Sequence, residues 1–131
     1  MKKRSKKQIA KRKKEFRFHK VSAINRKGIN YESWHPAYVF IEKGNIYIYV
    51  TITHSANVKD KIVIKLRRNP NKNDNRDSYY VAEVREDTKD KFGKRHANLK
   101  IDEQDDLDIR KLYKKRWFCQ SSFLALSAQE D

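Results

Sequence analysis

The chain has 131 residues, of which 32 are Lys or Arg and 17 are Asp or Glu, so its formal net charge is +15. The length suits one domain, and the 37% apolar content excludes a fully disordered chain. With only three glycines the chain cannot form a Gly-rich phosphate loop, and its one cysteine cannot form an internal disulfide. No apolar stretch is long enough for a membrane span or suitable for a signal peptide. We therefore expect a cytoplasmic protein with no membrane partner.

The first 20 residues concentrate the charge. They contain eleven basic residues and one acid, Glu15, so this segment carries +10 and the other 111 residues carry +5. Such a run is typical of a flexible arm that binds an anionic surface, and nucleic acid is the obvious candidate. A solubilising tail and a nuclear localisation signal are the alternatives. The arm residues expected to contact phosphates are Lys2, Lys3, Arg4, Lys6, Lys7, Lys11, Arg12, Lys13, Lys14 and Arg17.

Organised structure is expected from about Trp34 onward, and the strongest local signal is a β-hairpin. Residues 37–41 and 46–53 are dense in β-branched and aromatic side chains, and a short polar connection that contains a glycine joins them. In the second run the isoleucines share one face, while Tyr47 and Tyr49 share the other. The isoleucine face is expected to pack, and the tyrosine face to be polar-tipped.

Two further strands are expected after the hairpin. They cover residues 61–66 and 78–84, and an Asn-rich loop over 67–77 separates them. Residues 85–100 are polar and irregular, and they predict no regular element. This part of the chain is therefore read as a strand, a long loop, a strand and a second excursion.

A helix is predicted over residues 102–118. Asp102 is a suitable N-cap, acids occupy the first turns, and basic residues occupy the last turns, which matches the helix dipole. One apolar stripe can dock this helix on the sheet, and its residues are Ile109, Leu112, Tyr113 and Trp117. Residues 119–131 form a tail or an extension of the helix.

These elements fit an α+β, mainly β fold. We expect a small, strongly bent antiparallel sheet or SH3-like barrel with one C-terminal helix, divided into a basic flexible arm (1–20), a domain (21–118) and a tail (119–131). Small barrels bind single-stranded nucleic acid across faces of aromatic and basic side chains. Ordinary cross-strand pairing explains the two tyrosines equally well. The side chains that could form a nucleic-acid face are Tyr47, Tyr49, Lys65, Arg67 and Arg68.

Polar residues at strand ends are the candidates for chemistry. Zinc spacing and the Gly-x-Ser-x-Gly elbow do not occur, so no metal or cofactor is expected. His35 precedes the first hairpin strand, and Thr53, His54 and Ser55 close the second. RNA cleavage by the 2′-hydroxyl needs a base, an acid and donors to the phosphate oxygens, which these four residues could supply as catalytic groups. The alternative is that they only cap turns and strand ends.

The order of these features resembles the PemK/MazF toxin family over about residues 34–84. The resemblance rests on His35-Pro36, the hairpin, Thr53-His54-Ser55 and a following strand with Lys65. It implies an SH3-like barrel and a metal-independent endoribonuclease of a toxin-antitoxin pair, acting as a homodimer that an antitoxin inhibits. It aligns His35 with the family's catalytic arginine and Thr53 or Ser55 with its catalytic hydroxyl. The chain differs in this histidine, in the inserted His54 and in a short first loop.

The sequence thus predicts a protein that binds RNA or DNA, with RNA as the expected ligand. Toxin-type endoribonuclease activity is one hypothesis. The alternative is a non-catalytic accessory protein that uses the arm for phosphates and the barrel for a protein partner.

Overall fold

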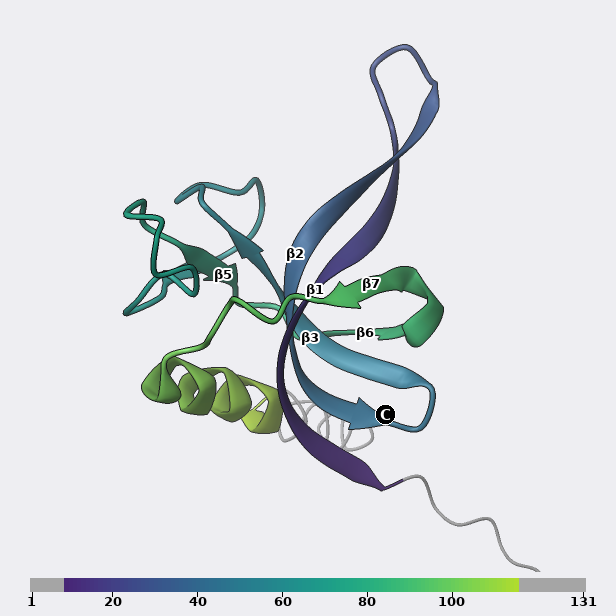
Figure 1. The fold of residues 1–131 in the computed structure, drawn as a ribbon. Coiled ribbons are helices and arrows are strands. Elements are labelled where there is room, and N and C mark those ends of the chain that lie inside the picture. Colours follow the sequence, from purple (N-terminus) through teal and green to yellow (C-terminus); the bar gives the residue numbers. More distant parts are fainter. Residues whose placement is uncertain (1–8, 116–131) are drawn as a thin grey trace, which may run out of the picture.

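The computed structural model describes residues 9–115 (Figure 1). Among these residues are seven strands, one short 3-10 helix and one α-helix. The strands are β1 (Ala10–Ile24), β2 (Asn30–Lys43), β3 (Ile46–Thr53), β4 (Val63–Lys65), β5 (Tyr79–Val81), β6 (Arg85–Thr88) and β7 (Phe92–Arg95). The 3-10 helix η1 (Lys89–Lys91) joins β6 to β7, and the α-helix covers residues 103–115.

All strand pairs are antiparallel, and three long strands form the centre of the sheet. The strand order is β4-β5-β3-β2-β1-β7, and β6 also pairs with β3. Because β6 pairs with β3 and β7 pairs with β1, the segment 85–95 crosses one face of the central strands from one edge to the other. Register shifts in both central ladders help the sheet to bend.

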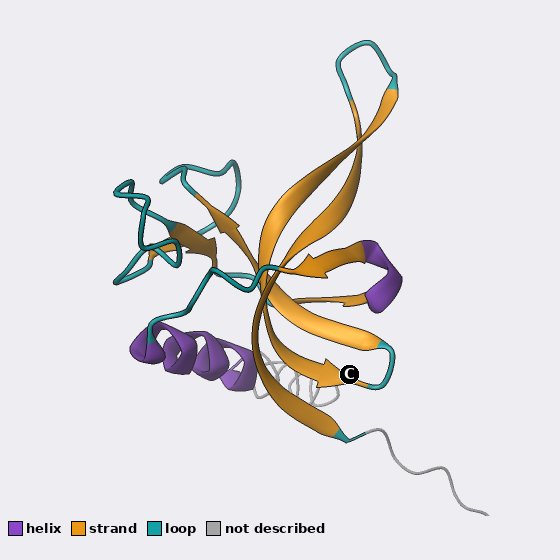
Figure 2. Cartoon of the chain, in the orientation of Figure 1, coloured by secondary structure: helices purple, strands orange, loops and turns teal. Residues whose placement is uncertain are grey.

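The opposite face of the central strands carries the larger core. Alternate residues of each strand point to this face, and the helix of residues 103–115 covers part of it through Ile109, with Leu112 and Tyr113 packed beside it. The buried residues of this core are Phe16, Tyr38, Phe40, Ile48, Val50, Ile52, Leu66, Tyr80, Val84 and Ile109. The loops around β4 and β5 gather into a lobe beside the helix (Figure 2).

The predicted hairpin and helix are confirmed. β2 and β3 are joined by a tight turn in which Gly44 has a φ of 58°, a left-handed angle that suits glycine. Asp102 caps the helix, since its Oδ2 accepts from the backbone N–H groups of Gln104 (3.1 Å) and Asp105 (3.2 Å). The α+β, mainly β fold with a C-terminal helix is also confirmed. Residues 116–131 lie outside the described part of the chain.

The prediction of a flexible arm over residues 1–20 is wrong for residues 10–20. These residues form most of β1, which lies between β2 and β7, so the organised structure begins well before Trp34. The charges are compatible with a strand because acids distant in sequence offset them. Asp106 pairs with Arg12 (3.1 Å), and Glu42 pairs with Lys13 (3.0 Å).

The excursion over residues 85–100 also contains unpredicted structure. It forms β6, η1 and β7, whose short polar stretches have no clear periodicity. The predicted strands over 61–66 and 78–84 are found as the shorter β4 and β5. No helix in the described residues is long and apolar enough to cross a membrane.

Candidate nucleic-acid interface

The residues at the end of β3 order the turn that follows it. The backbone N–H of Ser55 donates to Thr53 Oγ1 (3.1 Å), and Ser55 Oγ donates to the carbonyl of Asn57 (2.7 Å). The ring of His54 contacts the carbonyl of Asp77 through Nδ1 (3.0 Å). Each of the three predicted catalytic side chains thus has a local structural role.

His35 lies on a different part of the sheet. Its Nε2 is 3.1 Å from Ser33 Oγ on the same strand, and its side chain is exposed. The ladder between β2 and β3 ends at the pair Ala37–Thr51, so His35 lies beyond the region where these strands are hydrogen-bonded. Within residues 9–115, no hydrogen bond or ion pair joins His35 to Thr53, His54 or Ser55.

Tyr47 and Tyr49 do not form an open face, contrary to the prediction. Both are buried beneath β7, where each ring packs edge-on against Phe92 with centroids 5.1 Å apart. Burial raises the pKa of Tyr49 to about 12. Sequence periodicity could not anticipate this, because the strands that cover the tyrosines come from the unassigned segment 85–100.

Several predicted phosphate contacts are engaged within the protein. Arg17 contacts Glu15 (3.0 Å) and the carbonyl of Gly93 (2.7 Å), so this side chain fastens β1 to β7. Lys11 and Lys14 are exposed. Lys2, Lys3, Arg4, Lys6 and Lys7 lie outside the described residues.

The basic residues at the end of β4 and directly after it are exposed but paired. Lys65 lies 3.4 Å from Asp77, and Arg67 lies 3.4 Å from Asp108. Arg68 is the most exposed of the three, and its contact with Asp102 is long at 3.7 Å. Exposed ion pairs of this kind are weak, so these basic side chains can leave their carboxylate partners and bind a phosphate instead.

A row of rings that are at least partly exposed, which the sequence analysis missed, lies where β1, β2 and β7 meet. We call Phe18, Trp34 and His96 the aromatic row. Phe18 and Trp34 are 38% and 51% exposed, and both lie close to Gly93. The rings of Phe18 and His96 meet edge-on, with centroids 5.3 Å apart.

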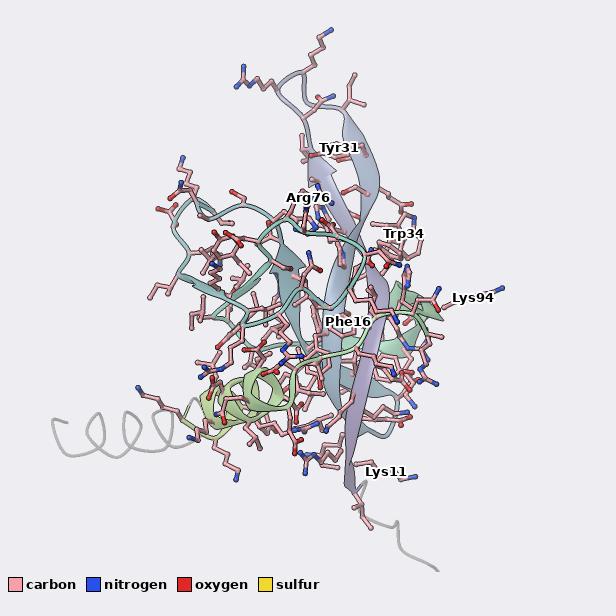
Figure 3. The ribbon with its side chains drawn as sticks, turned by 60° about the vertical axis from the view of Figure 1, so that its left-hand side comes forward. Lys11, Phe16, Tyr31, Trp34, Arg76 and Lys94 are labelled. Carbon is pink, nitrogen blue, oxygen red and sulfur yellow. The ribbon has the colours of Figure 1, made fainter. Side chains whose placement is uncertain are left out.

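Two lysines lie near the aromatic row, but only one shares its face. Lys20 pairs with Trp34 across the β1–β2 ladder, so their side chains share a face of the sheet. Lys94 follows Gly93 on β7 and projects into solvent (Figure 3). Because neighbouring residues of a strand point to opposite faces, Lys94 leaves β7 on the face opposite to the one that Gly93 turns toward the rings.

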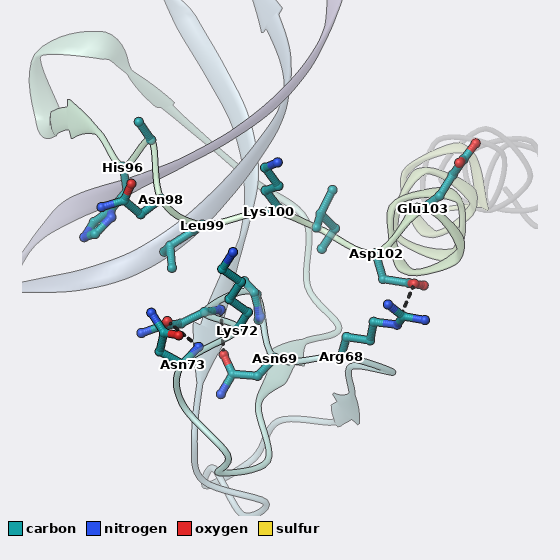
Figure 4. A pocket seen from close by; sticks show the side chains of 14 residues that line it. Arg68, Asn69, Lys72, Asn73, His96, Asn98, Leu99, Lys100, Asp102 and Glu103 are labelled. Carbon is teal, nitrogen blue, oxygen red and sulfur yellow. Dashed lines mark hydrogen bonds and ion pairs between the residues drawn. The ribbon is translucent and has the colours of Figure 1, made fainter.

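A groove of about 950 Å³ begins at His96. One wall is the Asn-rich loop, and the other is the segment 96–103 that leads into the helix (Figure 4). The backbone N–H of Lys100 donates to the carbonyl of Pro70 (3.1 Å) at the base of this loop. The charged and amide side chains that line the groove are Arg68, Asn69, Asn71, Lys72, Asn73, Asn98, Lys100, Asp102 and Glu103.

The basic and acidic side chains of the groove are not evenly placed. Lys72 and Lys100 face each other in the middle of the groove in Figure 4, between His96 at one end and Asp102 and Glu103 at the start of the helix. Asp102 is also occupied by capping the helix and by Arg68. The groove and the aromatic row together form a continuous surface with exposed rings, amides and cations, which we call the candidate interface.

The sequence carried little signal for this surface. Phe18 lay in a basic run, and Trp34 and His96 lay outside every predicted element. In residues 9–115, no cluster of three or more His, Cys, Asp or Glu side chains could hold a metal ion.

Comparisons with known proteins add no relative: no family model matches the chain, and neither the curated proteins nor the solved structures yielded a match. The resemblance to the PemK/MazF family stays a prediction.

Proposed function

We propose that this protein binds single-stranded nucleic acid on the candidate interface, without cleaving it. RNA is the expected ligand, because recognition of RNA commonly targets unpaired bases that stack on aromatic side chains. In this proposal the aromatic row stacks with bases, and the lysines around it neutralise phosphates.

The observation that carries the proposal is the gathering of three rings that are at least partly exposed beside cations. A lone exposed aromatic residue is ordinary on a protein surface. Here Phe18 contacts His96, and Phe18 and Trp34 both lie near Gly93. Lys20 shares the face of Trp34, and a groove that contains several basic side chains begins at His96. Stacking platforms beside positive grooves are the usual means of binding single strands with little sequence preference.

The charge of the whole molecule supports the same proposal. Residues 9–115 alone hold 26 basic and 15 acidic side chains, a net charge of +11. Eleven of these fifteen acids lie within 4 Å of a basic side chain, so the excess charge is basic. Such a surface attracts a polyanion, and binding should weaken as salt concentration rises.

Replacing the indole of Trp34 tests the stacking role. We expect Trp34→Ala to weaken binding of a single-stranded RNA oligonucleotide by about 1–3 kcal/mol, roughly 5- to 150-fold, because one stacking ring is lost. Trp34→Phe should retain much of the affinity. Fluorescence anisotropy with labelled RNA and DNA oligonucleotides measures both effects and gives the preference between them.

Ile62→Ala is the matched control, because Ile62 is another large exposed apolar side chain and does not line the groove. It should bind as the unaltered protein does. Equal losses in Trp34→Ala and Ile62→Ala, or no salt-dependent binding by the full chain, would contradict the proposal. If the full chain instead captures only a protein, the accessory alternative gains support.

A further inference from the structure

The β1–β2 hairpin extends beyond the rest of the sheet. β7 pairs with β1 only as far as His19, and β3 pairs with β2 only as far as Ala37. From the pair Lys20–Trp34 to the pair Ile24–Asn30, the two strands are hydrogen-bonded only to each other. We call residues 20–34 the ribbon. Figure 1 shows it projecting from the body of the protein.

The tip of the ribbon is held by one asparagine. Asn25 Oδ1 accepts from the backbone N–H groups of Lys27 (2.8 Å) and Ile29 (3.0 Å), and the Asn25 N–H donates to the Ile29 carbonyl (3.0 Å). Gly28 adopts a φ of 79°, which glycine tolerates. The turn therefore presents Arg26 and Lys27 at the end of a defined structure.

The ribbon carries exposed apolar side chains and basic side chains without ion-pair partners. Ile24 is 68% exposed and Ile29 is 57% exposed. Among the described residues, Arg26 and Lys27 have no ion-pair partner, and the one acid of the ribbon, Glu32, is paired with Lys20 (3.3 Å). Two-stranded ribbons are only marginally stable in water, so exposed apolar side chains on one indicate a binding surface.

One face of the ribbon continues the surface of the aromatic row. Residues two apart on a strand share a face, so Phe18, Lys20 and Ile24 of β1 point to the same side, together with Trp34 of β2. A single-stranded nucleic acid whose base stacks on Trp34 can therefore follow this face outward to Arg26 and Lys27 at the tip. The ribbon spans about five residue pairs, or roughly 17 Å.

We propose that the ribbon is a second contact region for the same single-stranded nucleic acid, in which Arg26 and Lys27 neutralise phosphates and Ile24 covers the sugars or bases between the tip and Trp34. This inference rests on the proposed function. The inference adds that the binding site extends from the groove to the tip of the ribbon. An oligonucleotide that reaches only from the groove to the aromatic row therefore makes no contact with the tip. Charge complementarity favours a polyanion over a second copy of this chain, which is itself strongly basic.

Oligonucleotide length separates the two regions. We compare the full chain with Arg26→Gln/Lys27→Gln on a 6-nucleotide and a 16-nucleotide single-stranded RNA, lengths near the limits of known single-strand sites. The double variant should bind the 16-mer about 25-fold more weakly at 0.1 M salt and equally well at 1 M. This follows because the slope of log K against log salt concentration falls by about 0.7 for each phosphate contact that is lost. Two lost contacts change the affinity about 25-fold over a tenfold range of salt. Binding of the 6-mer should not change.

Lys111→Gln/Lys114→Gln is the matched control. It removes the same charge from exposed positions on the helix, which lies at the other end of the molecule from the ribbon (Figure 1). This control should bind the 16-mer nearly as the full chain does. Circular dichroism of each variant verifies that the fold is retained, since all four side chains are exposed.

The remaining outcomes overturn the inference in distinguishable ways. If the full chain binds the 6-mer and the tip variant binds the 16-mer unchanged, the ribbon is not a contact region, but the proposed function stands. Equal losses in the tip and helix variants would show a general effect of net charge. Failure of the full chain to bind either RNA would contradict the proposed function itself. A smaller assembly of the tip variant in light scattering would show that the ribbon joins copies of the chain.

Discussion

At the scale of single residues, a buried carboxylate connects three elements of the fold. Asp106 is fully buried on the helix and accepts hydrogen bonds from Tyr38 Oη (2.5 Å) on β2, Arg12 Nη2 (3.1 Å) on β1 and Arg110 Nε (2.9 Å). Arg110 in turn donates to the carbonyl of Phe40 (2.7 Å). Burial opposes ionisation of Asp106, but the bonds from Arg110 and Tyr38 outweigh it and hold its pKa below the ordinary value.

The charge of Asp106 should therefore stabilise the protein. We expect Asp106→Asn to lower the free energy of unfolding by roughly 3 kcal/mol near neutral pH, because Arg110 loses its buried partner. The folded-state pKa lies below the unfolded one, so this contribution is present above the unfolded pKa and is lost as pH falls through the folded pKa. The difference in the free energy of unfolding between Asp106→Asn and the unaltered protein should narrow below about pH 4. Urea unfolding at a series of pH values measures this difference.

Asp60→Asn is the control for this experiment. Asp60 is exposed and has a φ of 60°, which asparagine also tolerates, so its stability should stay close to that of the parent. A gap for Asp106→Asn that stays constant from neutral pH into acid would contradict the role given to its charge.

At the scale of elements, β1 is the feature that most changes the interpretation of the sequence. Its basic residues suggested an arm, yet the strand contributes Phe16 to the larger core and His19 to the opposite face. His19 Nε2 lies 2.9 Å from Asp87 Oδ2 on β6, and its ring packs on Phe92 of β7. A single strand thus supports both faces of the sheet and one side of the ribbon.

Two truncations test this role of β1. Removing residues 1–8 leaves every contact described here in place, so the product should unfold cooperatively near the melting temperature of the full chain. Removing residues 1–20 deletes most of a central strand and should prevent folding, because Phe16 and the Arg12–Asp106 pair are lost. Circular dichroism with thermal unfolding compares the two. A folded product lacking residues 1–20 would show that the sheet does not depend on β1.

At the scale of the whole molecule, function depends on which distant segments meet. The aromatic row takes one ring from β1, one from β2 and one from the segment after β7. The four residues predicted to be catalytic make separate contacts instead. His35 contacts Ser33 on β2, Thr53 and Ser55 order the turn at the end of β3, and His54 contacts the carbonyl of Asp77. A binding surface therefore has more structural support than a cleavage site.

We accordingly expect binding of single-stranded RNA without cleavage. Purified full chain incubated with labelled RNA in EDTA should leave the RNA intact, with a metal-independent ribonuclease as the positive control. Cleavage that disappears in His35→Ala and Thr53→Ala would instead establish the toxin-type endoribonuclease hypothesis. Cleavage unchanged in both variants would indicate a contaminating nuclease.

Local signals in the sequence were sufficient for some elements, but within the candidate interface they indicated only Arg68. The β2–β3 hairpin and the cap at Asp102 follow from turn chemistry and side-chain type within a few residues. The ribbon was missed because basic residues obscured the alternation in β1, and the rings of the interface were missed because each stands alone in its own segment.

By itself the sequence determined the mainly β class, the hairpin, the C-terminal helix and the excess of positive charge. Each of these depends on composition or on neighbours along the chain. Only the tertiary structure decided that residues 10–20 form a strand, that Tyr47 and Tyr49 are buried and that Phe18, Trp34 and His96 share a surface. The physical reason is that burial and charge pairing are settled by partners far away in sequence: Asp106 offsets Arg12, and Phe92 covers the tyrosines.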